Sequence, residues 1–167
     1  SVSVIDSLGC NLTGSVSVDQ STIPAPSICV ISVDSSSTKN NIVWEKPNTQ
    51  SIDHFLIYRQ LSNGIYSLVG NVDYDSLSEF SDNTFGINPN ITSYRYKLSY
   101  VDTCGNESQL SDYHETIHLS TNLATNGGIN LIWDGYEGIP VSYYRILRDS
   151  TNIDDWQIMD SVNNNVF

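Results

Sequence analysis

The stretch "NIVWEKPNTQSIDHFLIYR" (residues 41–59) occurs a second time, in altered form, as "NLIWDGYEGIPVSYYRILR" (residues 130–148). The two tryptophans align, and so do the two final arginines, each pair 89 residues apart (133 − 44 and 148 − 59). Each copy runs from its Trp through a turn into an alternation of aromatic and aliphatic residues. A repeat of this length indicates two related structural units in tandem.

The amino-acid composition indicates an all-β chain. Apolar residues make up 39% of the 167 residues, and charged residues only 16%. That is too apolar for a disordered chain, and Val, Ile, Tyr and Thr separated by Asn, Asp, Gly and Ser are typical of strands and turns. Short alternating segments between polar turns therefore predict a β-sandwich or barrel.

The charge of the chain argues against several kinds of partner. The formal net charge is −12 at pH 7. Such a surface repels phosphate groups, so we expect neither nucleic acid nor an anionic membrane as a partner. No run approaches the roughly 18 apolar residues of a membrane span, so we expect no membrane insertion. Because the chain opens and stops within strand patterns, we interpret it as a segment of a longer protein.

The residues around the repeat resemble the fibronectin type III family. That family places a core Trp in its second strand, here Trp44 and Trp133, and carries Tyr-x-Tyr-x-apolar in its sixth, here "YRYKL" (residues 94–98). The resemblance implies that the first Tyr of this motif forms a corner hydrogen bond with the backbone. The side chains expected in the core are Trp44, Tyr58, Tyr94, Tyr96 and Trp133.

The resemblance divides the chain into tandem Ig-like and fibronectin type III β-sandwiches, the last one incomplete. Residues 1–20 are similar to the C-terminal hairpin of a PKD-type Ig-like domain, and residues 21–26 form a linker stiffened by proline. Residues 27–118 are expected to form one fibronectin type III-like domain, and residues 119–167 the N-terminal part of a second. The segment "HETIHLS" (residues 114–120) is then the last strand of one domain, running directly into the first strand of the next.

The same segment contains His-Glu-x-x-His, the pattern of zinc proteases, at residues 114–118. A zinc protease carries it on a helix, where residues i and i+4 lie about 6 Å apart and both rings reach one metal ion. In a strand the two histidines share a face but lie about 13 Å apart. Because "ETIHLSTN" is rich in β-branched residues, we expect a strand. We expect no enzyme, since no nucleophile elbow or phosphate loop occurs elsewhere.

Three cysteines lack the spacing of metal ligands. In the fold that the resemblance implies, Cys29 begins the first strand and Cys104 lies in the loop after the sixth, at the same pole. A Cys29–Cys104 disulfide is therefore expected, and two unpaired cysteines are the alternative. Cys10 is expected to pair outside this segment.

Two kinds of surface site are further candidates. Loop oxygens of Asp102 and Asn106 suit calcium, the one candidate cofactor, and the alternative is that these residues brace their own turn. Asp-Ser followed by Leu, Thr or Val is similar to the O-glycosylation tripeptide of bacteria with type IX secretion. The candidate acceptors are Ser7, Ser76, Ser150 and Ser161.

The segment "VDTCGNES" (residues 101–108) resembles the end of the sixth strand in bacterial fibronectin type III domains. Together with the opening hairpin, it is similar to large modular surface proteins exported by type IX secretion. This resemblance implies an extracellular or cell-surface spacer whose partners are the flanking domains of the same polypeptide. The alternative is a recognition module for a glycan, a secretion protein or an envelope protein, using the loops at the Cys104 pole.

Overall fold

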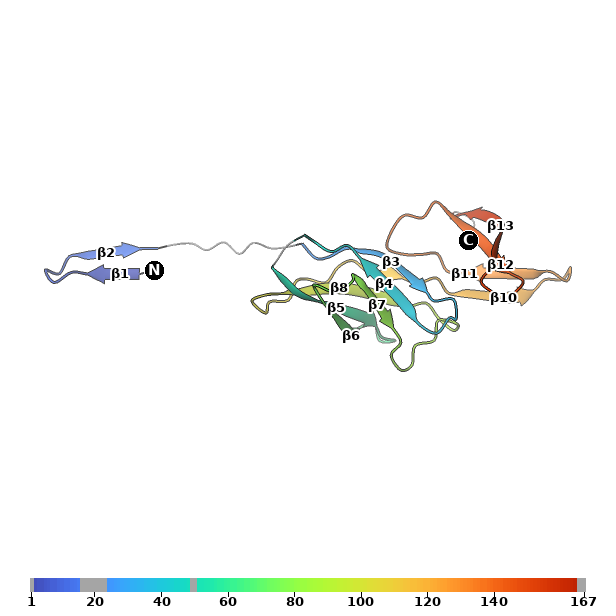
Figure 1. Cartoon of the computed structure of the whole chain (residues 1–167), viewed down its shortest axis with the longest axis horizontal. Coiled ribbons are helices and arrows are strands. Elements are labelled where there is room, and N and C mark those ends of the chain that lie inside the picture. The colour runs from blue at the N-terminus through green and yellow to red at the C-terminus, as the bar shows by residue number, and fades with distance from the viewer. Residues whose placement is uncertain (1, 16–23, 49–50, 165–167) are drawn as a thin grey trace.

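The computed structural model describes residues 2–15, 24–48 and 51–164. Within these ranges it contains thirteen β-strands and no helix, so the all-β prediction is confirmed (Figure 1). No helix among these residues is long and apolar enough to cross a membrane.

The N-terminal hairpin pairs β1 (Val2–Ile5) with β2 (Asn11–Gly14) in antiparallel register. Its turn is closed by the Asp6 carboxylate, which accepts hydrogen bonds from the backbone N–H groups of Leu8 and Cys10. Neither strand pairs with any other described strand. β2 ends at Gly14, and residues 16–20 of the expected hairpin lie outside the described residues, as does the linker up to residue 23.

The centre of the chain is a two-sheet β-sandwich, which we call the first repeat (Figure 1). This is the architecture that fibronectin type III domains share. One sheet has the order β3-β4-β7 and the other the order β6-β5-β8-β9. The strands are β3 (Ile28–Val33), β4 (Asn40–Trp44), β5 (Ile52–Gln60), β6 (Tyr66–Asp73), β7 (Glu79–Asp82), β8 (Arg95–Asp102) and β9 (His114–Glu115).

The core of the first repeat follows the period of two that strands impose on side chains. Trp44 from β4 lies against Phe55 from β5, with ring centroids 5.3 Å apart, and both are buried. Tyr96 and Leu98 from β8 cover them and are fully buried. The apolar layer between the sheets is therefore built from alternate residues of β4, β5 and β8.

Two of the expected core tyrosines behave differently. Tyr94 packs against the core and its hydroxyl accepts the backbone N–H of Asn88 at 2.7 Å, which is the expected corner bond. Tyr58 is not a core residue, because Phe55 and Ile57 take the inward positions of β5. Its hydroxyl instead donates to Glu107 on the surface at 2.7 Å.

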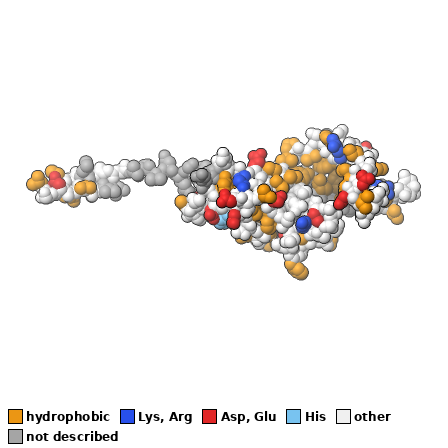
Figure 2. Space-filling model, viewed as in Figure 1, with side chains coloured by type: hydrophobic (Ala, Val, Ile, Leu, Met, Phe, Trp, Pro, Cys, Tyr) orange, Lys and Arg blue, Asp and Glu red, His pale blue; other side chains and the backbone are white. Residues whose placement is uncertain are grey.

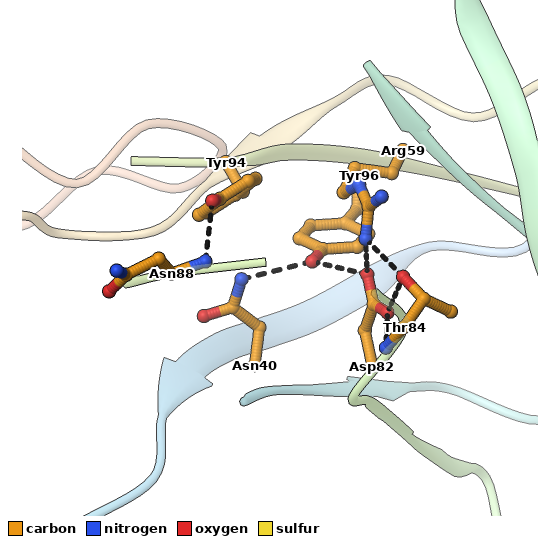
Figure 3. Close-up of polar contacts among 7 residues, drawn as sticks. All are labelled: Asn40, Arg59, Asp82, Thr84, Asn88, Tyr94 and Tyr96. Carbon is orange, nitrogen blue, oxygen red and sulfur yellow. Dashed lines mark hydrogen bonds and ion pairs between the residues drawn. The ribbon is translucent and has the colours of Figure 1, made fainter. Parts of the chain in front are cut away.

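A buried polar network joins the two sheets (Figure 3). The Asp82 carboxylate, fully buried on β7, accepts from Arg59 Nη1 at 2.5 Å and from the Tyr96 hydroxyl at 2.8 Å. Its second oxygen accepts from the N–H and hydroxyl of Thr84, and the Asn40 amide donates to the Tyr96 hydroxyl. The carboxylate is therefore bonded on both oxygens, as a buried charge requires.

The electrostatics of this network follow from burial. Burial raises the pKa of Tyr96, and the nearby Asp82 charge raises it further, so the phenol remains a donor. Burial opposes the charge on Arg59, but the hydrogen bond and charge of Asp82 outweigh it and raise the pKa of Arg59. The Arg59 guanidinium therefore keeps its positive charge.

The remaining strands form two hairpins, which together we call the second repeat. One hairpin pairs β10 (Leu119–Leu123) with β11 (Ile129–Trp133), and the other pairs β12 (Tyr143–Asp149) with β13 (Trp156–Asn163). They are separate two-stranded sheets. By the sequence alignment they correspond to β3, β4, β5 and β6 of the first repeat. The expected positions of the domain boundaries remain predictions.

Replacing Asp82 by Asn is expected to lower the free energy of unfolding by about 3 kcal/mol, because the Arg59 charge loses its buried partner. The matched control is Glu79→Gln, which removes an exposed carboxylate from the same strand and should change stability by less than about 0.5 kcal/mol. Urea unfolding followed by tryptophan fluorescence measures both. Equal losses would contradict a structural role for the ion pair.

Candidate functional site: a joint between the two repeats

The segment at residues 114–118 connects the two repeats as a short extended link. The strand β9 ends at Glu115 and β10 begins at Leu119. The expectation of one continuous strand is therefore wrong. Thr116 still belongs to the first repeat, since its N–H donates to the Tyr94 carbonyl and its hydroxyl accepts from the Tyr94 N–H. The chain then enters a different sheet within two further residues.

The two histidines of the His-Glu-x-x-His pattern bond different groups. His114 Nδ1 lies 2.7 Å from the Tyr136 hydroxyl, whereas His118 Nε2 lies 3.1 Å from the carbonyl oxygen of Asn90. In the described part of the chain, no three His, Cys, Asp or Glu side chains gather where they could hold a metal ion. The segment lacks the helix that would point both rings at one zinc ion.

Tyr136 is the central residue of the joint. It lies in the loop between β11 and β12, and its hydroxyl accepts the backbone N–H of Ile31 at 2.9 Å while contacting His114 Nδ1. Ile31 belongs to β3 and His114 to β9, the edge strands of the two different sheets of the first repeat. One side chain of the second repeat therefore bridges both sheets of the first.

The loop that carries Tyr136 is also fixed from its own side. The Tyr136 backbone N–H donates to the Tyr144 hydroxyl at 2.9 Å, which ties the loop to β12. The Tyr136 ring meets the His114 imidazole edge to face, with centroids 5.7 Å apart and an interplanar angle of 82°. The ring is thus held by contacts at its backbone, its face and its hydroxyl.

Burial sets the protonation states of His114 and Tyr136. It lowers the pKa of His114, against an opposing effect from the Asp112 charge, so the imidazole is neutral at pH 7. Burial raises the pKa of Tyr136, so the phenol keeps its proton. With Ile31 donating to the hydroxyl oxygen, we assign the phenol proton to His114 Nδ1, and the imidazole proton to Nε2.

A second set of contacts surrounds Glu137. Its carbonyl accepts the Glu115 N–H at 2.9 Å, forming a bridge between the repeats. Its carboxylate accepts from the Tyr113 hydroxyl and lies 3.6 Å from Arg95. Arg95 also pairs with Glu115 at 2.6 Å, and the Glu115 hydrogen bond raises the pKa of Arg95. These groups are partly exposed, so they add orientation more than stability.

Gly138 makes the close approach possible. Its φ of +125° is a conformation that favours glycine, and a Cβ atom there would lie 2.3 Å from Cγ of His114. The His114 ring therefore occupies the space of a side chain at position 138. The sequence shows "DGYEGIP" as a turn between strands, and nothing in its local pattern indicates contact with residues more than twenty positions upstream.

The expected Cys29–Cys104 disulfide is absent, and both residues are free thiols. Cys29 lies in β3 of one sheet, and Cys104 follows β8 of the other. A disulfide requires Cβ atoms about 4 Å apart, and a shared pole does not by itself bring residues of two sheets to that distance. Cys10 is also a free, exposed thiol, and its pairing outside the segment remains a prediction.

The Asp102 carboxylate is occupied by its own turn. It accepts the N–H groups of Cys104 and Asn106, at 2.9 and 2.8 Å, and the side-chain amide of Asn106 at 3.0 Å. These bonds, that of the Asn106 amide first, lower the pKa of Asp102. The arrangement is the turn bracing that the sequence offered as the alternative to calcium.

The remaining candidate residues lie apart from the joint. Trp133 is only half-buried, and its ring lies against that of Tyr144 from β12, with centroids 6.0 Å apart. All four candidate glycosylation serines are exposed, namely Ser7, Ser76, Ser150 and Ser161. Their modification remains a prediction.

Neither a family model nor a curated protein matches the chain. Among solved structures, a Fn3-like protein from Clostridium thermocellum is similar, with a TM-score of 0.45 and 20% identity, over 56% of this chain and 90% of that one. A beta-1,2-glucanase from Parabacteroides distasonis is similar with a TM-score of 0.44 and 20% identity, over 63% of this chain and 14% of the glucanase. The strand order described above, not these similarities, supports the fold assignment.

Replacing Gly138 by Ala is expected to separate the Tyr136 loop from His114, because the new Cβ overlaps the imidazole ring. The protection of the Glu115 amide against hydrogen exchange should then fall by about tenfold, since its bond to Glu137 is lost. The matched control is Gly127→Ala, which also has a positive φ, +83°, but has no atom within 4 Å of a Cβ. If both variants exchange alike, the steric fit at His114 does not hold the joint.

Proposed function

We propose that the chain is a non-catalytic structural segment of an extracellular, cell-surface or secreted modular protein, holding neighbouring domains in a fixed array. The observation that carries this proposal is the bridge from Tyr136 of the second repeat to both sheets of the first. A joint of this kind transmits orientation from one domain to the next. Its partners are the flanking domains of the same polypeptide.

Three features of the joint support stiffness. The link between β9 and β10 is only residues 116–118, and Thr116 at its start is 1% exposed and bonded on both its N–H and its hydroxyl. The Tyr136 hydroxyl and the Glu115–Glu137 backbone bond connect the repeats at separate points. A flexible tether would need a longer link without such bonds.

The extracellular setting is supported by the resemblance to bacterial surface proteins and by the net charge of −12. The exposed candidate glycosylation serines fit the same setting. A non-catalytic role is supported by the separate partners of His114 and His118. The role requires no cofactor. Recognition of a glycan or an envelope protein through the Cys104 pole remains a prediction without a specific contact in its favour.

The distance distribution between spin labels on the two repeats tests the fixed array. One label is placed on the exposed Cys104 and the other on Thr125→Cys in the turn between β10 and β11, with Cys10 and Cys29 replaced by Ser and Ala. We expect one narrow distance for this protein and a broad distribution after Tyr136→Phe, which removes only the bridging hydroxyl.

The matched control is Tyr143→Phe. Tyr143 is 49% exposed, and its hydroxyl accepts a hydrogen bond from Arg145 of the same strand, so the narrow distance distribution should persist. A broad distribution before any substitution at residue 136 would contradict the proposed role. So would a distribution that Tyr136→Phe leaves unchanged.

A further inference from the structure

An apolar groove of about 440 Å³ lies between the two hairpins of the second repeat. Figure 2 shows hydrophobic side chains gathered around a hollow in this part of the molecule. The lining of the groove includes Leu131, Trp133, Tyr144, Ile146 and Trp156. All are partly or largely exposed, which is costly for side chains of this size.

The groove residues correspond to core residues of the first repeat. With the 89-residue offset, four groove residues align with four core residues of the first repeat: Leu131 with Ile42, Trp133 with Trp44, Tyr144 with Phe55, and Ile146 with Ile57. The first-repeat members are 0–3% exposed, whereas the second-repeat members are only half-buried. In the first repeat, Tyr96, Leu98 and Tyr100 of β8 complete the burial. The groove therefore occupies the place of the β8 side chains.

The strand edge beside the groove is also open. In the first repeat, β5 pairs with β6 on one side and β8 on the other, whereas its counterpart β12 pairs only with β13 among the described strands. Asn164 donates to the Ser142 carbonyl, so even-numbered residues at the start of β12 face β13. Alternation then directs the backbone N–H groups of Tyr143 and Arg145 to the open edge.

The charges specify the occupant more closely. Arg59 of the first repeat pairs with Asp82 of β7 at 2.5 Å, and its side chain is 12% exposed. Its counterpart Arg148 is exposed and forms no ion pair within the described residues. An occupant that places an Asp carboxylate beside Arg148 would complete the same buried pair, which apolar contact alone would not supply.

We propose that the groove binds a two-strand polypeptide segment of the β7–β8 type, with an Asp that pairs with Arg148 and a Tyr-x-Tyr-x-Leu strand that lies along β12. The first repeat indicates its source, since there β7 follows β6 in the same polypeptide through residues 74–78. A segment joined to β13 in the same way reaches the groove. This inference goes beyond the spacer role and does not depend on it.

The probe is a synthetic peptide of residues 77–102, which carries β7 and β8. We expect it to shift the tryptophan fluorescence of the chain and to slow hydrogen exchange of the Tyr143 and Arg145 amides. The Asp82→Asn peptide should bind about tenfold more weakly, and so should Arg148→Gln protein with the unchanged peptide. Combining both changes should add little further loss, because they remove one ion pair. The matched control protein, Lys39→Gln, loses one positive charge between β3 and β4 of the first repeat, away from the groove, and should keep its affinity.

Three results would overturn the inference. One is the absence of amide protection with peptide up to about 1 mM. Another is protection that depends on protein concentration without peptide, which would assign the groove to a second copy of the chain. The third is binding that ignores both Asp82 and Arg148. None of these results alters the inter-repeat distance, so failure here is distinguishable from failure of the spacer role.

Discussion

The Tyr136 hydroxyl is the group on which the arrangement of the two repeats depends. The edge strands β3 and β9 belong to different sheets, and nothing in a ladder of backbone hydrogen bonds connects them. The hydroxyl contacts both, through the Ile31 N–H and His114 Nδ1. A polar bridge in this position satisfies a backbone donor at an open edge, which would otherwise be available for pairing with another strand. The joint and the edge of the sandwich are thus protected by the same contact.

The two repeats share aligned apolar positions and an aligned arginine, but these side chains are more deeply buried in the first repeat than in the second. In the first, β7 and β8 bring Asp82 and Tyr96 to Arg59, and the apolar residues around them are closed off from water. In the second, the aligned Arg148 remains exposed, and the aligned apolar residues line a groove. A cation can enter a sandwich core only together with its counter-charge. In the proposed complex, completion of the second core and pairing of Arg148 are therefore one event.

The sequence predicted the features that depend on the alternation of side chains within a strand. It missed those that depend on contacts between residues far apart in the chain. The repeat, the burial of Trp44 and Tyr96 and the Tyr94 corner bond follow from alternation within strands. The prediction placed Tyr58 on the wrong face of β5. Successive side chains of a strand point to opposite faces, so an error of one residue moves a side chain from the core to the surface. The expected Cys29–Cys104 disulfide rested on a shared pole, whereas a disulfide depends on the distance between the two Cβ atoms, which the sequence does not give. Tyr136 and Gly138 make their contacts across the joint, and the sequence of their turn does not indicate these contacts.

The central claim is that the two repeats form one rigid body, and residual dipolar couplings of backbone amides test it most directly. Couplings are measured separately for strands β3–β8 of the first repeat and for strands β10–β13 of the second. If the joint is fixed, both sets of couplings fit one alignment tensor of the same orientation and magnitude. A clearly smaller tensor for the second repeat, or one of different orientation, would show independent motion and would contradict the fixed joint.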